Sequence, residues 1–456
     1  MTHPSDSVAN LRATFQTHKT RPAEWRRTQL LRLKAMVEDN ESAIDAALHA
    51  DLGKSGFEAR MTETGTVLSE IGHALSHLKA WMRPRKVFTP LAAQPGHSRI
   101  RPEPLGVVLI IAPWNYPVYL TLMPLIGAIA AGNCAVLKPS EVSAHTSALL
   151  ARLIPAYMDG EAICVVEGDA DTSTALLAER FDHIFFTGSE NIGRIVMTAA
   201  AKHLTPVTLE LGGKSPCIIH TDCDLALAAR RVVWGKFLNA GQTCIAPDYL
   251  LVQDQMARQF VTHLKTAITA FFGEDPKTSP DYARLVSDRH FDRVEGLMSG
   301  GTIAAGGQTD RAIRYIAPTV LTGVEPEAAL MREEIFGPLL PIVSYRTIED
   351  AIGFVNARPK PLSLYLFSNS RQIRDQVMDL TSSGGVCIND VVMHLAVPGL
   401  PFGGVGTSGM GAYHGRTSFD TFSHAKAILT KSEYFDVPLR YPPFSKAKLR
   451  WLKWLQ

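Results

Sequence analysis

One cysteine, Cys244, stands among small and polar residues in the stretch FLNAGQTCIAP, residues 237–247. Unreactive cysteines usually lie in apolar cores, so a thiol in such a loop is a candidate nucleophile. A loop that is itself buried, with the cysteine as filler, explains the same stretch equally well. The stretch alone leaves both interpretations open.

Three polar side chains in other stretches suit acyl chemistry. Glu210 lies between two leucines in VTLELGGKSP, and a carboxyl group in apolar surroundings has a raised pKa that suits a general base near neutral pH. A glutamate that caps a backbone turn is the more common explanation of such a position. Asn115 lies between two prolines in APWNYP, where its amide can donate to a developing oxyanion. Glu334 belongs to a second acidic pair, in EEIFGP, before a Phe-Gly-Pro turn.

Two further stretches carry groups that suit phosphate and ribose. FFTGSENIG places Gly188 and Gly193 after an apolar run, at the expected start of a helix, where backbone N–H groups attract phosphate. The G-x-x-x-x-G spacing is a weak dinucleotide signature, and an ordinary turn explains it as often. LKPSE places Lys138 and Glu141 after another apolar run, where they can bind phosphate or ribose hydroxyls. Each of these two charges alone is more often simply solvated.

The composition narrows the class of protein. With 456 residues, 46% hydrophobic and 20% charged, the chain can bury a large core, in about three domains or one large α/β unit. A net charge of only +2 supplies no field to hold nucleic acid, so none is expected as a partner. The six cysteines are scattered without zinc-ligand spacing, so we expect no metal site and reduced thiols. The N-terminal stretch lacks the apolar region of a signal peptide, which favours a cytoplasmic location.

The elements that must position these groups follow from the hydrophobic pattern. From Leu105 onward, short apolar runs such as GVVLIIAP, NCAVLKPS and HIFFTGS alternate with longer helical patterns. Fully apolar strands separated by helices are typical of a parallel sheet with both faces covered. The sequence therefore predicts a Rossmann-like, doubly wound α/β domain, and a second strand and helix series from Pro216 predicts a second α/β domain.

Three local features complete the predicted organisation. Thr20 can cap an N-terminal helix that has Pro22 in its first turn. Residues 86–101 predict an extended hairpin around a Pro-Gly turn. The uncharged segment 104–137 is long enough to span a bilayer, but its three internal prolines argue against a transmembrane helix.

Taken together, the motifs resemble those of the aldehyde dehydrogenase superfamily, and the resemblance spans about 300 residues in the family's order. The short N-terminal lead and the stretches GGVCIND, GMGAYHG and SFDTFSH look most like its class 3 branch, which handles fatty and aromatic aldehydes. The matching stretches are PWNYP (113–117), LKPSE (137–141), FTGSENIG (186–193), LELGGKSP (209–216), GQTC (241–244), EEIFGP (333–338) and LPFGGVGTSGMG (400–411).

The resemblance implies a role for each candidate residue. Cys244 would attack the aldehyde, Asn115 would hold the oxyanion, and Glu210 would activate the water that hydrolyses the thioester. The implied cofactor is NAD, with NADP also accepted, bound by Lys138, Glu141, Gly188, Ser189, Gly193, Glu334 and Phe336. Tyr116, Trp234 and His394 are candidates for the wall of an aldehyde tunnel, although core packing explains the two aromatic residues equally well.

The implied substrates are medium- or long-chain aliphatic aldehydes or aromatic aldehydes, and the implied product is a carboxylic acid. Two alternatives stay open from the residues alone: a CoA-acylating relative, which commonly lacks the glutamate that matches Glu210, and a thiol-dependent ester hydrolase, which needs a histidine base. A homodimer is expected, with the hairpin bridging the subunits.

The predicted division of the chain has six parts. They are N-terminal helices of the cofactor domain (1–85), an oligomerisation hairpin (86–103), the NAD(P)-binding domain (104–210), the catalytic domain (211–398), a return to the cofactor domain with an oligomerisation strand (399–443), and a basic amphipathic tail (444–456).

The tail FSKAKLRWLKWLQ predicts a helix with an apolar stripe that includes Trp451 and Leu452, flanked by Trp454 and surrounded by basic residues. Such a helix can make a weak peripheral contact with an anionic membrane. Packing on its own dimer near the substrate entrance is the slightly favoured alternative.

Overall fold

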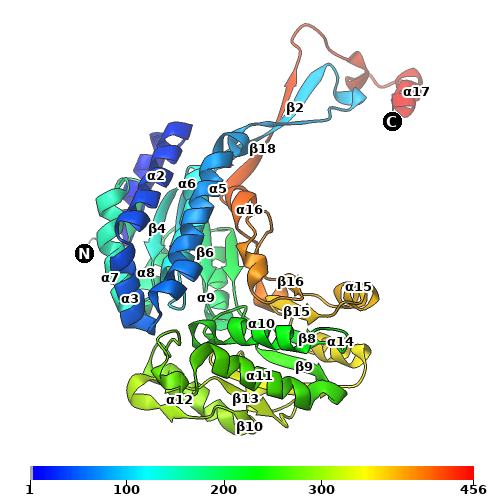
Figure 1. Ribbon diagram of the computed structural model, residues 1–456. Coiled ribbons are helices and arrows are strands. Elements are labelled where there is room, and N and C mark those ends of the chain that lie inside the picture. Colours follow the sequence, from blue (N-terminus) through cyan, green and yellow to red (C-terminus); the bar gives the residue numbers. More distant parts are fainter. Residues whose placement is uncertain (1–3, 456) are drawn as a thin grey trace.

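A computed structural model describes residues 4–455, which form two α/β bodies and a projecting arm (Figure 1). The first body contains a six-stranded sheet in the order β17-β7-β6-β3-β4-β5, parallel except for β17. Its strands are β3 (Val107–Ile111), β4 (Cys134–Lys138), β5 (Ile163–Val165), β6 (His183–Thr187), β7 (Val207–Glu210) and β17 (Gly409–Met410).

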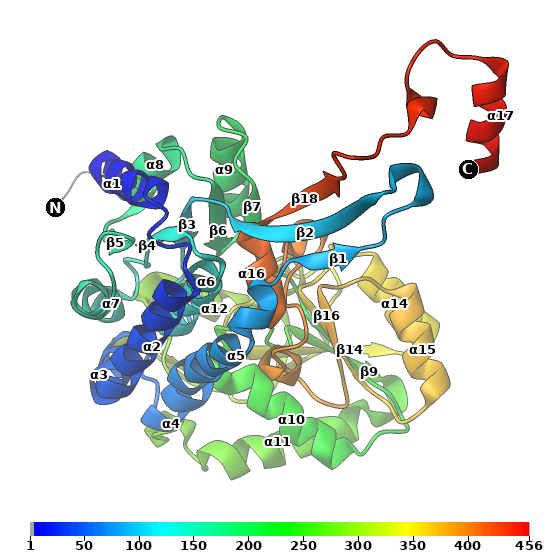
Figure 2. The same cartoon turned by 90° about the horizontal axis from the view of Figure 1, so that it is seen from above.

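Helices cover both faces of this sheet, with α1, α8 and α9 on one side and α2, α6 and α7 on the other (Figure 2). Because both faces are covered, β3, β4 and β6 are apolar and almost wholly buried, as their sequences predict. The helices of this body are α1 (Pro4–Gln16), α2 (Ala23–Asp39), α3 (Glu41–Leu52), α4 (Gly56–Ala59), α5 (Gly65–Met82), α6 (Pro117–Ala131), α7 (Ala144–Tyr157), α8 (Ala170–Ala178), α9 (Glu190–Ala201) and α16 (Gly415–Thr421).

The second body is built on a seven-stranded sheet in the order β10-β13-β14-β9-β8-β15-β16, in which only β10 runs antiparallel to its neighbour. Its strands are β8 (Pro216–Ile219), β9 (Tyr249–Gln253), β10 (Thr302–Ala305), β13 (Thr319–Thr322), β14 (Leu339–Tyr345), β15 (Ser363–Phe367) and β16 (Gly385–Ile388). Its helices are α10 (Leu225–Phe237), α11 (Ala257–Phe272), α12 (Asp288–Leu297), α13 (Ala329–Arg332), α14 (Ile348–Asn356) and α15 (Arg371–Leu380), and β11 (Thr309–Asp310) and β12 (Tyr315–Ile316) form a separate two-stranded ladder. The prediction of two α/β bodies, the first doubly wound, is confirmed.

The arm consists of β1 (Arg85–Val87), β2 (Gly96–Pro104) and β18 (Ser423–Lys431), all paired antiparallel. The extended hairpin predicted within residues 86–101 is therefore present, and β18 joins it from the far end of the chain. The chain then leads to helix α17 (Lys446–Leu455), which stands away from both sheets in Figures 1 and 2. Residues 1–3 and Gln456, the outer ends of the predicted first part and tail, lie outside the described residues.

One local prediction is wrong. Thr20 does not cap helix α2, because its hydroxyl donates to the carbonyl of Gly132 at 2.6 Å, and Pro22 takes the cap position without a side-chain bond. The buried Thr20 thus ties the start of α2 to the turn before β4. Among residues 4–455, no helix has the length and apolar character needed to cross a bilayer.

Candidate active site

The carboxyl ends of four neighbouring strands of the first sheet meet at one edge. Asn115 follows β3, Lys138 ends β4, Gly188 follows β6 and Glu210 ends β7. The chain runs outward from β3 to β4 and β5, and then returns to the other side with β6 and β7. Such a reversal of strand order opens a crevice at the carboxyl edge, where nucleotides bind in doubly wound folds.

The predicted phosphate and ribose groups lie along this edge. Ser189 is the N-cap of the twelve-residue helix α9, yet its side chain makes no capping bond, so the first N–H groups of the helix are free to meet an anion. Gly188 and Gly193 allow close packing at the start of α9, because the side chains of Phe186 and Leu211 fill the space that a Cβ on either glycine would need. The Lys138 ammonium, although buried, reaches the exposed Glu141 carboxylate at 3.2 Å. These features fit the phosphates and a ribose of a dinucleotide.

The EEIFGP stretch comes from the second body and packs against the motif that follows β7. Gly212 has no room for a Cβ because the Glu334 carboxylate occupies that space, and a Cβ on Gly241 would meet the Gly337 carbonyl. Burial raises the pKa of Glu334 to about 8, with a further contribution from the Asp248 charge. Phe336 has a φ of 47°. The glycines therefore bring three sequence motifs into contact.

Helix α10 leads into the loop of Cys244 through a turn of left-handed residues. Asn239 and Ala240 both have a φ of 51°, which costs on the order of 1–3 kcal/mol for each non-glycine residue and persists only where surrounding contacts enforce it. Gln242 supplies such contacts: its amide donates to the carbonyls of Asn239 and Arg284, and its side-chain oxygen accepts from the Val286 N–H. The loop is buried and held by several hydrogen bonds, and the reactivity of Cys244 stays a prediction.

Cys244 itself is half-buried at the end of this loop. Burial raises the pKa of its thiol, and the nearby Glu334 and Glu210 carboxylates raise it further. The backbone N–H groups of Cys244 and Ile245 bond the sulfur and lower the pKa. The thiol is therefore protonated in the free protein and needs activation to become a nucleophile.

Asn115 reaches the Cys244 loop directly. Its side-chain Nδ2 donates to the Gln242 carbonyl at 3.0 Å, two residues before the cysteine, and this bond uses one of the two amide hydrogens. The next residue, Tyr116, bonds the Thr243 hydroxyl at 2.5 Å. The loop after β3 and the loop of the cysteine are thus joined by two adjacent buried contacts.

Glu210 is a buried carboxyl group without a partner. Both of its side-chain oxygens are buried, and neither makes a hydrogen bond. Burial raises the pKa of Glu210 well above its usual value. The carboxyl group is close enough to raise the pKa of the Cys244 thiol and of the phenols of Tyr119 and Tyr413. An orphaned acid beside a thiol has the chemistry of a general base for water.

The three predicted tunnel residues lie in different surroundings. Tyr116 is buried beside Thr243, whereas Trp234 is half-buried on α10, where it packs on the second core. His394 bonds the Ser363 hydroxyl at 3.0 Å and faces Tyr365, whose phenol donates to the Ile245 carbonyl. Burial lowers the pKa of His394 to about 4, so the ring is neutral at physiological pH.

Several neighbours of the site were not predicted. Tyr119 bonds His414 at 2.9 Å, and Tyr413 lies close enough for the Cys244 charge to raise its pKa. These residues belong to stretches next to or inside recognised motifs, so proximity in sequence was their only signal. Lys54 and Glu63, which contact the Asn115 region, lie in an N-terminal segment with no motif at all. Among residues 4–455, no group of three or more His, Cys, Asp or Glu is arranged to hold a metal ion.

The chain is similar in sequence and structure to known aldehyde dehydrogenases. The profile described as the Aldehyde dehydrogenase family matches residues 5–428. The chain is 52% identical to rat aldehyde dehydrogenase family 3 member A2 over 448 residues, which cover 98% of this chain and 93% of the relative. It is 51% identical over 451 residues to the rat aldehyde dehydrogenase described as dimeric and NADP-preferring, covering 98% and 99%.

A solved structure agrees with the same family. The substrate-bound state of Staphylococcus aureus AldH superimposes with a TM-score of 0.97 at 45% identity, and the match covers 99% of both chains.

The unpartnered Glu210 gives a testable effect of pH on stability. Its folded pKa lies above its unfolded pKa, so the wild-type protein loses stability as pH rises from the unfolded value toward the folded value, by about 1.4 kcal/mol per pH unit. Glu210→Gln removes this loss. Thermal melting of both proteins from pH 5 to pH 8 should show that the melting temperature of the variant rises relative to that of the wild type as the pH increases. Parallel pH profiles would contradict burial of an unpaired carboxyl group.

Proposed function

The chain belongs to the aldehyde dehydrogenase family and oxidises aldehydes with NAD(P), and from this premise we propose that Cys244, Asn115 and Glu210 carry the chemistry. The observation that supports this assignment is the meeting of a thiol, an amide and an orphaned carboxyl group at the contact of two sheets. The three groups come from a stretch of 130 residues, Asn115 to Cys244, and no local pattern would gather them.

In the proposed reaction the Cys244 thiol loses its proton to solvent, and the resulting thiolate attacks the aldehyde carbon to form a thiohemiacetal anion. The negative oxygen accepts from the Asn115 amide, whose second hydrogen is not used by Gln242, and from the Cys244 backbone N–H. NAD(P), held by the residues assigned below, would supply the acceptor for the hydride that leaves this carbon, so that a thioester would remain on the cysteine. Donors fixed before the charge develops cost no reorganisation during the reaction, which makes them effective.

Glu210 then acts as the base for hydrolysis. It takes a proton from water as the oxygen attacks the thioester carbon, and the carboxylic acid leaves while the sulfur regains its thiolate. The raised pKa of Glu210 makes its carboxylate a stronger base than an exposed glutamate. A water-activating carboxyl group favours release of an acid over transfer of the acyl group to CoA.

We assign the cofactor contacts on the same basis. Ser189, Gly188 and Gly193 would hold the phosphates at the start of α9. Lys138 and Glu141 would bind the adenosine ribose, and a carboxylate at Glu141 favours a free 2′-hydroxyl, and hence NAD, without excluding NADP. Glu334 and Phe336 would contact the nicotinamide riboside.

Aldehydes with a medium or long chain or an aromatic ring are the proposed substrates, supported by the aromatic surroundings of Cys244. Tyr116 and His394 are proposed to line the tunnel, and Trp234 to lie at its outer part.

The sheet topology supports the proposed division of the chain into six parts. Strand β7 ends at Glu210 and β8 opens the second sheet at Pro216, while β17 returns to the first sheet by pairing with β7. The arm of β2 and β18 offers an edge for a second subunit. A cytoplasmic location stays a prediction from the cysteine pattern.

Two variants test the assignment. Cys244→Ala should abolish NADH formation while the Kd for NAD stays near the wild-type value, because the nucleophile is lost and the phosphate site is not.

Glu210→Gln should release one NADH per site and then stop, because hydride transfer precedes hydrolysis. Stopped-flow absorbance measures both. Turnover by the alanine variant, or no burst from the glutamine variant, would contradict the roles given.

From the projecting arm we expect the protein to form a homodimer. Sedimentation velocity should give one dimeric species across micromolar concentrations, since β2 and β18 project from the body with an exposed ladder edge (Figure 2). A monomer throughout that range would refute the proposal.

A further prediction concerns the helix at the C-terminal end of the chain. Helix α17 exposes Trp451, Leu452 and Trp454, with Lys446, Lys448, Arg450 and Lys453 around them. We propose that this helix covers the substrate entrance of the dimer, or binds an anionic membrane weakly. The full chain and a chain ending at Phe444 are compared by co-sedimentation with anionic vesicles and by the rate on long-chain aldehydes. Equal vesicle binding excludes the membrane contact, and an unchanged rate excludes the entrance contact.

A further inference from the structure

A buried ion pair from the N-terminal helices lies against the proposed oxyanion donor. Lys54, between α3 and α4, and Glu63 are 2.5 Å apart, and both side chains are fully shielded from solvent. A buried pair of this kind contributes little net stability, because removing two charges from water offsets their attraction. Its contacts therefore call for another explanation.

Glu63 holds the start of helix α6. It lies in a single π-helical turn, Arg60–Thr64, a distortion that is rare and often occurs at functional sites. Its Oε2 accepts from the backbone N–H groups of Val118 and Tyr119 at 2.8 and 3.1 Å. Tyr116, the N-cap of α6, makes no side-chain cap, so Glu63 satisfies the free N–H groups in its place.

Lys54 extends the contact from Glu63 to Asn115. Its ammonium donates to the Asn115 carbonyl at 2.9 Å and lies 4.0 Å from the centre of the Tyr116 ring. With the Glu63 bond, these contacts engage the ammonium on three sides. The backbone of Asn115 is thus fixed by a buried cation on one side and by the start of α6 on the other.

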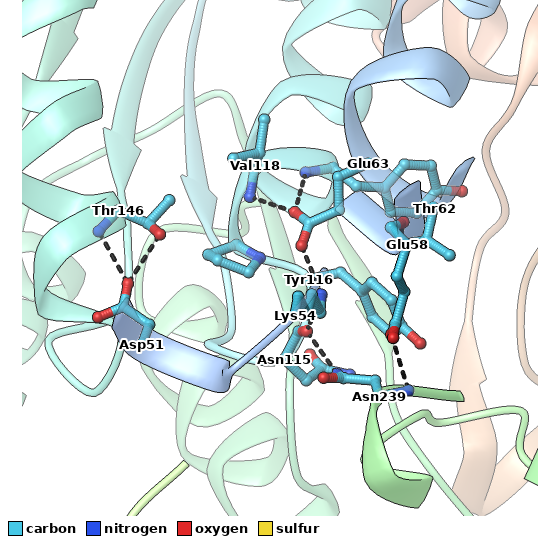
Figure 3. A network of polar contacts seen from close by, with 12 residues as sticks. Asp51, Lys54, Glu58, Thr62, Glu63, Asn115, Tyr116, Val118, Thr146 and Asn239 are labelled. Carbon is cyan, nitrogen blue, oxygen red and sulfur yellow. Dashed lines mark hydrogen bonds and ion pairs between the residues drawn. The ribbon is translucent and has the colours of Figure 1, made fainter. Parts of the chain in front are cut away.

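The network closes on the Cys244 loop. The Nδ2 of Asn239 donates both to the Asn115 carbonyl at 2.8 Å and to the Gln242 carbonyl at 3.2 Å, and Gln242 in turn accepts from the Asn115 side chain. Glu58, from the same N-terminal segment, accepts the Asn239 backbone N–H at 2.8 Å. Figure 3 shows the part of this network that runs from Glu63 through Lys54 and Asn115 to Asn239 and Glu58.

We propose that Lys54 and Glu63 form a positioning pair that sets the Asn115 amide for the oxyanion, an inference that rests on the proposed function of Asn115. The pair contacts Asn115, Tyr116 and the start of α6. It acts through the backbone of Asn115, and misplacement of a catalytic group by about 1 Å can cost on the order of a hundredfold in rate.

The test removes both charges together, so that no unpaired charge is left buried. The variant Lys54→Met/Glu63→Gln keeps the volume of both side chains and leaves a glutamine oxygen to accept from Val118. It is made in the Glu210→Gln background, where each intact site yields one NADH. The amplitude of NADH formation then counts folded sites, and the rate constant reports the chemistry, so misfolding and mispositioning are separated.

A second ion pair, at the opposite end of the six-stranded sheet, provides the control variant. Arg12 and Asp182 form an ion pair of 2.9 Å, and Asp182 also accepts a backbone N–H, that of Val107 at 2.8 Å. Arg12→Met/Asp182→Asn makes the same chemical change before β3 and β6, far from their carboxyl ends. It should leave the rate constant unchanged.

A double-mutant cycle with Asn115→Ala decides the question. We expect the Lys54/Glu63 change to slow NADH formation about tenfold or more in the presence of Asn115 and less than about twofold in its absence, with the amplitude and the Kd for NAD unchanged. Equal slowing in both backgrounds, or no slowing with Asn115 present, overturns the positioning role alone. An unchanged rate for Asn115→Ala overturns it together with the proposed role of Asn115.

Discussion

The hydrogen bond from the Asn115 amide to the Gln242 carbonyl is the contact on which the site depends, because it joins loops that belong to two different sheets. Asn115 follows a central strand of the first sheet, and Gln242 lies between strands β8 and β9 of the second. Neither sheet holds the thiol, the amide and the carboxyl group by itself. The reaction therefore requires the two bodies to keep one relative position, which short buried contacts at this point enforce.

Keeping that position has a cost in stability. Asn239 and Ala240 adopt left-handed backbone, Glu210 is buried without a partner, and Lys54 and Glu63 are removed from water as charges. Each feature disfavours folding when taken alone. They coincide around Cys244, and the two large apolar cores supply the stability that holds them there. Strain and unpaired polarity concentrated at one place are what a preorganised site requires.

The sequence predicted the parts of the structure that depend on local pattern. The apolar runs of β3, β4 and β6 and the glycines after them identify a doubly wound sheet, and the motifs around Cys244 and Glu210 identify the family. Thr20 shows the limit of such patterns: it has the right type and place for a helix cap, but the Gly132 carbonyl, 112 residues away, takes its hydroxyl. Lys54 and Glu63 could not be predicted either, since a lysine and a glutamate nine residues apart usually lie on a solvated surface. Only the tertiary fold, with its π-helical turn, buries them against Asn115.

The central claim is that the acyl group passes through Cys244 and that Glu210 acts only afterwards. Peptide mass spectrometry of the Glu210→Gln protein, quenched in acid after mixing with NAD and an aldehyde, tests it directly. The account predicts one acyl group per chain, carried by the peptide that contains Cys244 and absent without NAD. An acyl group on another of the six cysteines, or no adduct while NADH has formed, would contradict it.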